Sequence, residues 1–422
     1  MKGAKTKKQK KRPSTLELKP PFLSFKKLDY AAEISYYYGF MPIKAPTIER
    51  EDVIQANRID DPNAHKKNYG LTGDDELRIH PEEKIALLRT CEEQKLISPA
   101  QPLMLYYEGI PSRTEQGKKP GGHYRRFNLD VLGTTKSVAE AELIKASLEI
   151  LRDKGFKDLY IDINSIGDKD STMNFAREIS QFYRKHGSEM QTHCRTHFKK
   201  DVFAPVECTH EKCRQLSEQA PKSVSFLSEP SRAHFAEALE FLESMHIPYK
   251  IDNHLLGDRR LCCHTIFLIK TLNASDKADA PEETLALGYR YNSLAKKLDM
   301  KRDIPGIGVT ILFKERHNTH KKTHRIKNPQ VYFIQFGFDA KLKSLELIET
   351  LRNAKIPLHQ SLAKDKLSSQ LQTAENMKIP YVLIMGQKES LEGSVIVRNM
   401  TTRFQETVPI TELPTYLKEL KK

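Results

Sequence analysis

The sequence predicts an α+β protein, in which a core built on an antiparallel sheet precedes a smaller α/β domain. The length of 422 residues exceeds the ~100–200 residues of a usual domain, so more than one folding unit is expected. Short segments in the first part of the chain alternate apolar and polar residues, as half-buried antiparallel strands do. From about residue 328 onward, apolar strands alternate with helical segments, which is typical of a mostly parallel sheet covered by helices.

In the core, apolar residues at helical spacing predict a helix over residues 137–154. A second helix is predicted over residues 231–245, with Ser231 as its N-cap. Residues from about 168 to 225 are polar and rich in Cys and His, and we interpret them as an insertion. The predicted core strands are residues 103–107, 127–132, 159–163, 265–269 and 307–313.

The C-terminal part is predicted to begin near Asn328 and to fold as its own unit. Its helices are expected over residues 341–353 and around Leu367 to Ala374. Its strands are expected at residues 331–334, 356–359 and 381–385.

Composition excludes a membrane protein, because no stretch approaches the ~18–20 apolar residues that span a bilayer. The N-terminus carries positive charge without a following apolar segment, so it does not predict a secretory signal. Six cysteines are too few for a disulfide scaffold, and we therefore expect a cytoplasmic location.

Positive charge is concentrated in two segments. The chain has 69 basic and 55 acidic residues, a net charge of +14. Residues 1–12 hold seven Lys or Arg and no acid, and residues 314–327 hold six with one Glu, so 7 + 5 gives +12 of that total. Such clusters suit a nucleic-acid backbone, although a basic tail can also serve solubility or nonspecific contacts. We predict that residues 1–15 are a disordered basic arm.

Three common catalytic motifs are absent, namely G-x-x-x-x-G-K-[ST], H-E-x-x-H and G-x-S-x-G. The lone G-x-G at Gly306-Ile-Gly308 indicates a tight turn into a strand. The sequence therefore favours none of the phosphate-loop, zinc-protease or serine-hydrolase classes.

Paired arginines, Arg125 and Arg126, stand in a loop that leads into a predicted strand. Guanidinium groups fixed at the rim of a sheet can clamp a triphosphate or a carboxylate in a bidentate manner. The same arrangement also occurs as a surface ion-pair network, so this pattern alone leaves both interpretations open.

These arginines lie in a run that resembles a known family. Gly122-His-Tyr-Arg-Arg-Phe127 with Gly133 looks like motif 2 of histidyl-tRNA synthetase, a class II aminoacyl-tRNA synthetase. The flanks of that motif are matched by Tyr106-Tyr-Glu-Gly-Ile-Pro111, Ala139-Glu-Ala-Glu142 and Ile163-Asn-Ser-Ile-Gly167. The C-terminal segments Leu351-Arg352, Ile384-Met-Gly386 and Ser394-Val-Ile-Val-Arg398 are similar to the anticodon-binding domain that histidyl, threonyl, prolyl and glycyl enzymes share.

The resemblance begins at about Leu16 and implies a domain plan and an activity. A class II synthetase-like core would occupy residues 16–327, with the insertion at about 168–225, and an anticodon-binding-type α/β domain residues 328–422. The family activates histidine to the adenylate with ATP and Mg²⁺ and transfers it to tRNA. The resemblance also implies a homodimer that binds tRNA, ATP and an amino acid.

The resemblance assigns roles to particular residues. The motif 2 arginine, which binds the ATP α-phosphate, matches Arg125, where a fixed cation would offset charge on phosphorus. Glu82 matches the carboxylate that receives the ammonium group of the substrate. Arg290 and Tyr291 match the G-G-R-Y-D motif, with Tyr291 as a partner for the imidazole. These matches imply that Arg125 and Glu82 face each other in one shared cavity.

Other positions depart from the family pattern. His80 and Lys84 replace a family Arg and Thr. The catalytic arginine position holds Gly257, so Arg259, or its neighbour Arg260, would have to act after a register shift. The family signature R-G-L-D-Y-Y-T-R-T-V-F falls on residues 257–267, where its two tyrosines become Leu261 and Cys262.

Arg316 matches an ATP-binding arginine only if one extra residue precedes it, since otherwise Glu315 takes the position and would repel triphosphate. These departures favour a second hypothesis, a catalytically inactive paralogue that binds tRNA or a metabolite.

The insertion carries a pattern of soft metal ligands. Cys194-x-x-His197 and Cys208-x-His210-x-x-Cys213 have spacings that can close a tetrahedral zinc site. Cys194, His197, Cys208 and Cys213 are the predicted ligands, with His210 as the alternative fourth. Unpaired cysteines without a metal are the other interpretation.

Overall fold

The computed structural model describes residues 29–59, 77–98, 102–109, 124–208, 210–272, 282–314, 329–361 and 366–420. The predicted arm at 1–15 and Arg316 lie outside these residues. No helix in the described part of the chain has the length and apolar character needed to span a bilayer.

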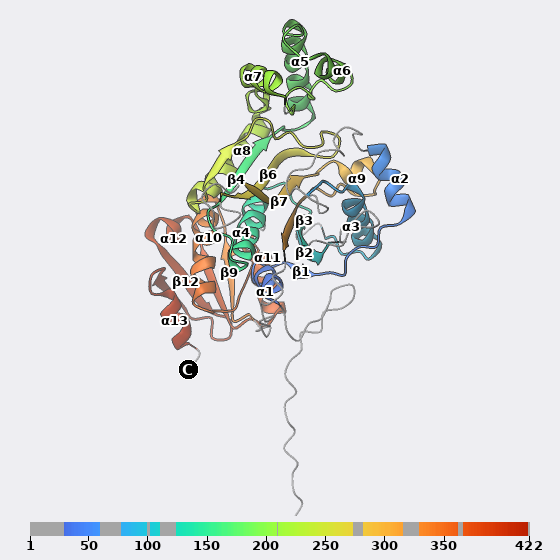
Figure 1. Cartoon of the computed structure of the whole chain (residues 1–422). Helices are drawn as coiled ribbons and strands as arrows, with labels where there is room; N and C mark the ends of the chain where they lie inside the picture. Colours follow the sequence, from blue (N-terminus) through green and yellow to red (C-terminus); the bar gives the residue numbers. More distant parts are fainter. Residues whose placement is uncertain are drawn as a thin grey trace, which may run out of the picture.

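An eight-stranded sheet forms the core, as the alternating segments predict (Figure 1). Its inner strand pairs are antiparallel, whereas the two edge pairs, β1 with β2 and β4 with β5, are parallel. In spatial order the strands are β1 (Met41–Pro42), β2 (Leu103–Glu108), β3 (Tyr124–Leu132), β8 (Gly306–Lys314), β7 (Glu283–Arg290), β6 (Cys263–Thr271), β4 (Leu159–Ser165) and β5 (Tyr249–Ile251).

Helices cover both faces of this sheet. On one face, α1 (Tyr30–Tyr37), α4 (Val138–Asp153) and α8 (Glu229–Ser244) pack in a cluster with Phe127 of β3. The other face packs with α3 (Pro81–Glu93) in a second cluster. Short helices α2 (Arg50–Ile59) and α9 (Leu294–Lys297) complete the core.

Strand β3 shows which side chains reach which face. Successive side chains of a strand point to opposite faces. Phe127 is therefore on the α1 and α4 face, while Arg126 and Asp130 point to the α3 face and pair with Glu83 and Lys84 of that helix.

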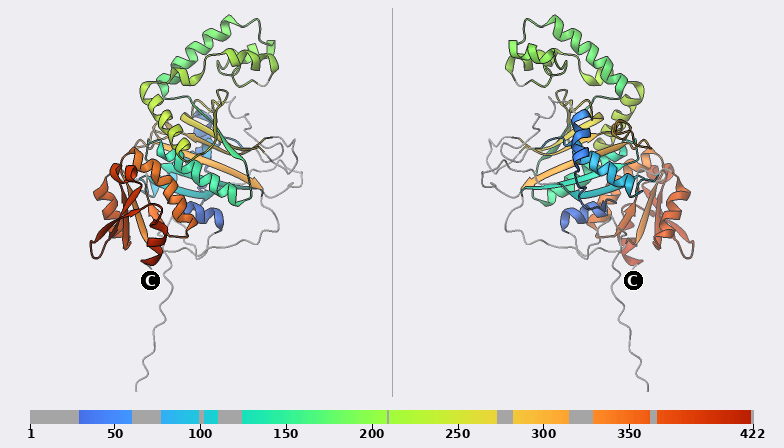
Figure 2. Two further views of the ribbon diagram at one scale, coloured as in Figure 1. Left: turned by 90° about the vertical axis from the view of Figure 1, so that its left-hand side faces the viewer. Right: turned by 90° about the vertical axis from the view of Figure 1, so that its right-hand side faces the viewer.

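The insertion leaves the sheet after β4 and projects from the core (Figures 1 and 2). Asp168 caps α5 by accepting a hydrogen bond from the Ser171 amide at 2.9 Å. The helices of the insertion are α5 (Lys169–Lys185), α6 (Thr192–Phe198), α7 (Glu211–Gln219) and the short 3₁₀ turn η2 (Ser223–Phe226).

The C-terminal domain has a five-stranded sheet of order β10-β9-β11-β12-β13. Its first three strands are parallel as predicted, and an antiparallel hairpin, β12 with β13, extends it. Its elements are β9 (Val331–Gln335), α10 (Phe338–Asn353), β10 (Leu358–Gln360), α11 (Leu367–Asn376), β11 (Tyr381–Met385), α12 (Gln387–Glu392), β12 (Ser394–Asn399), β13 (Gln405–Pro409) and α13 (Leu413–Glu419).

This domain packs closely on the core through α1 and α4. One hydrophobic cluster contains residues of both parts, including Tyr38 and Phe333. At its edge, Arg352 pairs with Glu149 at 3.0 Å and the Gln360 amide donates to Glu142 at 3.1 Å. The two parts therefore share a core at this interface.

A buried ion pair fixes α4 to the sheet. The Arg290 guanidinium, fully buried at the end of β7, contacts Glu140 through Nε to Oε1 at 2.8 Å and a second nitrogen to Oε2 at 2.5 Å. His234 of α8 lies 2.8 Å from the same carboxylate. Burial alone would raise the pKa of Glu140, but the charges of Arg290 and His234 outweigh it and lower the pKa to about 2.

We expect Glu140→Gln to destabilise the protein at pH 7 by about 3 kcal/mol, because the buried Arg290 charge loses its counter-ion. The folded-state pKa of Glu140 lies below the ordinary glutamate value of 4.5. Its contribution is therefore fully present above pH ~4.5 and is lost as the pH falls towards ~2. Urea unfolding measured between pH 7 and pH 3 should show the difference between wild type and variant shrinking with acidity.

The exposed pair Lys388 and Glu392 provides the control. Glu392→Gln should change the free energy of unfolding by less than about 0.5 kcal/mol. A Glu140→Gln variant as stable as this control would contradict the role given to the buried pair.

Candidate functional site

The face of the sheet under α3 holds a buried charge cluster centred on Asp130. The Lys84 ammonium donates to both Asp130 oxygens, at 2.7 and 2.8 Å. The Tyr291 hydroxyl donates to Oδ1 at 2.7 Å. The exposed fractions of the Lys84 and Asp130 side chains are 2% and 0%, so this ion pair is shielded from water.

Two glycines of β8 allow this cluster to pack against the strand. A Cβ atom at Gly308 would lie 2.0 Å from Asp130 Oδ1 and 2.7 Å from Lys84 Nζ. A Cβ at Gly306 would lie 2.4 Å from the Tyr291 ring. The G-x-G motif therefore belongs to the strand itself, where missing side chains make room for the buried pair.

Glu82, the predicted ammonium partner, stands in the first turn of α3, two residues before Lys84. Its side chain is 26% exposed and lies 3.0 Å from Nδ1 of His80. The next residue, Glu83, is buried and pairs with Arg126 at 3.1 Å. Glu82 is thus the more exposed of these two carboxylates at the start of α3.

Arg125 lies on the opposite face of the sheet. Its guanidinium contacts Asp29 at 2.5 Å and Glu108 at 2.9 Å, and it stacks 5.4 Å above the Phe127 ring. The expectation that Arg125 and Glu82 share one cavity is wrong, because strand alternation places Arg126, and not Arg125, on the side of α3.

Arg290 and Tyr291 are both buried and both have protein partners. All five N–H groups of Arg290 are used by Glu140, the carbonyl oxygens of Thr134 and Lys136, and the Asn292 side chain. Tyr291 donates its hydroxyl proton to Asp130. A substrate role for either residue would require these contacts to break.

Arg259, the predicted catalytic arginine, ties the insertion to the core. It pairs with Asp201 and with Glu207 at 3.2 Å, and its guanidinium lies 4.8 Å above the Phe203 ring. These three partners all belong to the segment between α6 and α7. Arg259 is therefore engaged with the insertion and not with the cluster around Asp130.

Gly257, which the resemblance matches to the family arginine, has a left-handed backbone. Its φ is +65°, and a Cβ there would lie 2.6 Å from Cδ1 of Ile266. Glycine suits this conformation, whereas an arginine would be strained and crowded.

The predicted metal ligands come together in the insertion. Cys194, Cys208 and Cys213 form a compact group, and a second group joins Cys194 to His193 and His210. His197 belongs to neither group, and its ring lies 4.4 Å from that of His193. Of the two alternatives for the fourth ligand, the geometry favours His210.

Sequence reasoning missed the pairing of Lys84 with Asp130. The replacement of a family Thr by Lys84 was visible, but its partner is 46 residues away in a strand. The available signal was the acidic residue in the middle of the apolar segment 127–132, since a buried carboxylate requires a cation.

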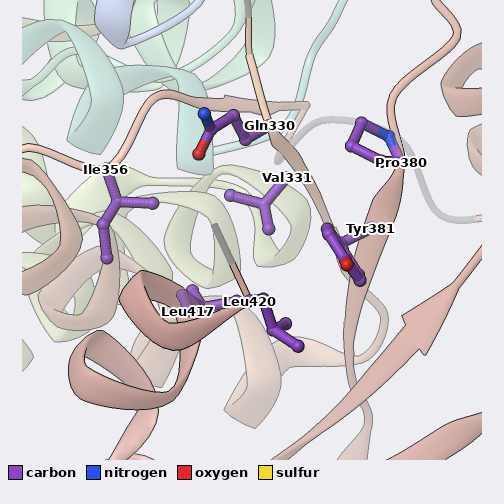
Figure 3. A pocket seen from close by; sticks show the side chains of 7 residues that line it. All are labelled: Gln330, Val331, Ile356, Pro380, Tyr381, Leu417 and Leu420. Atoms are coloured by element: carbon purple, nitrogen blue, oxygen red, sulfur yellow. The ribbon is translucent and has the colours of Figure 1, made fainter. Parts of the chain in front are cut away.

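A separate pocket of about 370 Å³ lies in the C-terminal domain (Figure 3). Leu417 of α13 and Leu420, which follows that helix, face Val331 and Tyr381 across it. Its lining contains no charged side chain, so it does not suit a phosphate or a carboxylate.

Comparison with known proteins gives consistent results. A family model described as "Anticodon binding domain" matches residues 330–420. The chain is 27% identical over 400 residues to a histidine–tRNA ligase of Lysinibacillus sphaericus, covering 92% of this chain and 93% of that protein. A histidine–tRNA ligase of Staphylococcus aureus is 26% identical over 399 residues, covering 92% and 94%.

The crystal structure of apo histidyl-tRNA synthetase from S. aureus superposes with a TM-score of 0.50 at 22% identity, covering 91% of this chain and 93% of that one. This similarity concerns the fold. The chain is therefore similar to histidine–tRNA ligases along most of its length, with a class II synthetase-like core and an anticodon-binding domain at its C-terminal end.

Proposed function

We propose that this chain is a tRNA-binding relative of the histidyl-tRNA synthetases that does not activate histidine. The observation that carries the proposal is the buried contact of Lys84 with both oxygens of Asp130. An amino acid substrate brings an ammonium group that needs a carboxylate partner. On the α3 face, the fully buried carboxylate of Asp130 already has a cation.

Charge repulsion opposes the binding of a second cation beside Asp130. An ammonium about 4 Å from Lys84 Nζ would be repelled by roughly 4 kcal/mol at an effective dielectric constant of ~20. Glu82, the other carboxylate proposed for this role, pairs with His80. Substrate binding would therefore need both a displaced lysine and a new arrangement of these side chains.

The surroundings of Arg125 also disfavour a triphosphate. The carboxylates of Asp29 and Glu108 contact its guanidinium, so these three groups together carry a charge of −1. A nucleotide phosphate would have to displace at least one carboxylate. The local charge is thus opposite to that of an ATP-binding site.

Support for tRNA binding comes from the C-terminal domain and from the distribution of charge. The anticodon-binding model covers residues 330–420, and the two basic segments of the sequence supply most of the net positive charge. The relatives matched along the chain are named histidine–tRNA ligases. A tRNA is therefore the expected partner.

The turn between β12 and β13 offers a surface for an unpaired base. Phe404 is 66% exposed there and follows Arg403. The Asn399 side chain accepts hydrogen bonds from the amides of Thr401 and Thr402 at 2.9 and 3.0 Å, which orders the turn. An exposed aromatic ring beside an arginine suits stacking of a single-stranded base.

Active histidine–tRNA ligase is the second candidate, favoured by similarity along 92% of the chain to relatives with that name. In that case the protein would bind ATP, Mg²⁺ and histidine and act as a homodimer, as the family resemblance implies. Arg125, Glu82, Arg290 and Tyr291 would then contact the substrates only after the rearrangements described above.

ATP–pyrophosphate exchange with histidine separates the two candidates. Folded protein supplied with ATP and Mg²⁺ should give no exchange above the protein-free control, because Lys84 blocks the ammonium position. The same preparation should bind tRNA in a filter assay, with affinity falling steeply as salt rises. Histidine-dependent exchange would contradict the proposal, and absence of tRNA binding would contradict both candidates.

Phe404→Ala should weaken tRNA binding about tenfold, corresponding to ~1.4 kcal/mol of lost stacking. Leu391→Ala is the matched control, because Leu391 is 79% exposed on α12 and lies outside the turn. Equal affinities of the two variants in fluorescence anisotropy would exclude the turn from the tRNA interface.

A double-mutant cycle tests the buried pair directly. Lys84→Met should cost about 3 kcal/mol or more in the free energy of unfolding, since it leaves the Asp130 carboxylate without a counter-ion. Adding Asp130→Asn should recover part of this loss. Strictly additive effects in urea unfolding would show that the two side chains do not interact.

A further inference from the structure

Four side chains of the insertion converge between α6 and α7. Cys194 belongs to α6, Cys208 follows it in the connecting segment, His210 caps α7, and Cys213 lies in its first turn. Cys194 and Cys213 are 4% and 0% exposed. The four residues thus gather from two helices and the segment that joins them.

The separations among Cys194, Cys208 and His210 are close to the edges of a tetrahedral metal site, and slightly shorter. The two sulfurs of Cys194 and Cys208 are 3.5 Å apart, and Nδ1 of His210 lies 3.4 and 3.1 Å from them. Zinc bond lengths of ~2.3 Å to sulfur and ~2.0 Å to nitrogen give ligand separations of about 3.8 and 3.6 Å. Cys213 places its sulfur within 4.8 Å of both other sulfurs.

The cysteines of this group are free thiols, and the sulfur separation of 3.5 Å is well beyond a disulfide bond. Three thiols and an imidazole form a soft ligand set, which selects zinc over magnesium or calcium. With four protein ligands no position stays open for water, so such a site is structural and not catalytic.

The insertion also has a physical need for such a cross-link. Its helices α6 and α7 have only 7 and 9 residues, which is below the length of ~12–15 residues at which an isolated helix becomes marginal in water. The two helices bury only four residues between them, so a metal that joins both would add folding free energy that these few side chains do not supply.

We propose that the insertion binds one Zn²⁺ through Cys194, Cys208, Cys213 and Nδ1 of His210. The site lies directly beside the contact of Glu207 with Arg259, because Glu207 precedes Cys208 in the chain. Metal binding thereby holds the segment that fixes Arg259, and with it the loop that follows β5. This inference does not depend on the proposed function.

Metal analysis of the full chain, purified under reducing conditions and reconstituted with Zn²⁺, is the first test. Wild type should carry about one zinc ion per chain. His210→Ala should lose zinc to a competing chelator at a concentration that leaves wild type loaded. His197→Ala is the matched control, since both histidines are exposed, and it should behave as wild type.

Wild type without zinc after reconstitution, or with a disulfide between Cys194 and Cys208, would overturn the site. Equal zinc loss in His197→Ala and His210→Ala would overturn the ligand assignment.

Cobalt substitution provides a second test that does not rely on loss of a ligand. Co²⁺ in the wild-type protein should give the intense visible bands of tetrahedral thiolate coordination. His210→Cys should keep the metal and shift these bands towards those of a four-sulfur site, whereas His197→Cys should leave the spectrum unchanged. Weak bands of an octahedral ion in wild type would contradict the proposal.

Discussion

The architecture depends on the burial of charged side chains along both sides of α4. Glu140 faces the sheet and pairs with Arg290, while Glu142 and Glu149 face the C-terminal domain and contact Gln360 and Arg352. An ionised group buried without a partner costs several kcal/mol, so each carboxylate dictates where its partner must lie. One helix therefore sets the position of the sheet and of the C-terminal domain at the same time.

Much of the fold is predictable because its segments have strong periodicity. The helix predicted at 137–154 is found as Val138–Asp153, and the three parallel strands of the C-terminal sheet follow their apolar runs. The hairpin of β12 and β13 was missed as an extension of that sheet. Four of the five residues of β13 are exposed, so this edge strand lacks the apolar alternation that identifies strands.

The candidate site was less predictable. It depends on the face of the sheet to which each side chain points, and on ion pairs between residues that are far apart in the sequence. Two adjacent arginines in a strand point to opposite faces, and nothing local shows which of them faces α3. Arg126 meets Glu83, whereas Arg125 meets Asp29 and Glu108. The resemblance supplied the correct fold, but the environment of each side chain required the structure.

The left-handed backbone at Gly257 limits which residue this loop can hold. A side chain larger than hydrogen would be strained there and would press on Ile266. A guanidinium could enter at this position only if the loop and its neighbours were remodelled together. Engineering an arginine into this loop would therefore be a redesign of the backbone and not a single substitution.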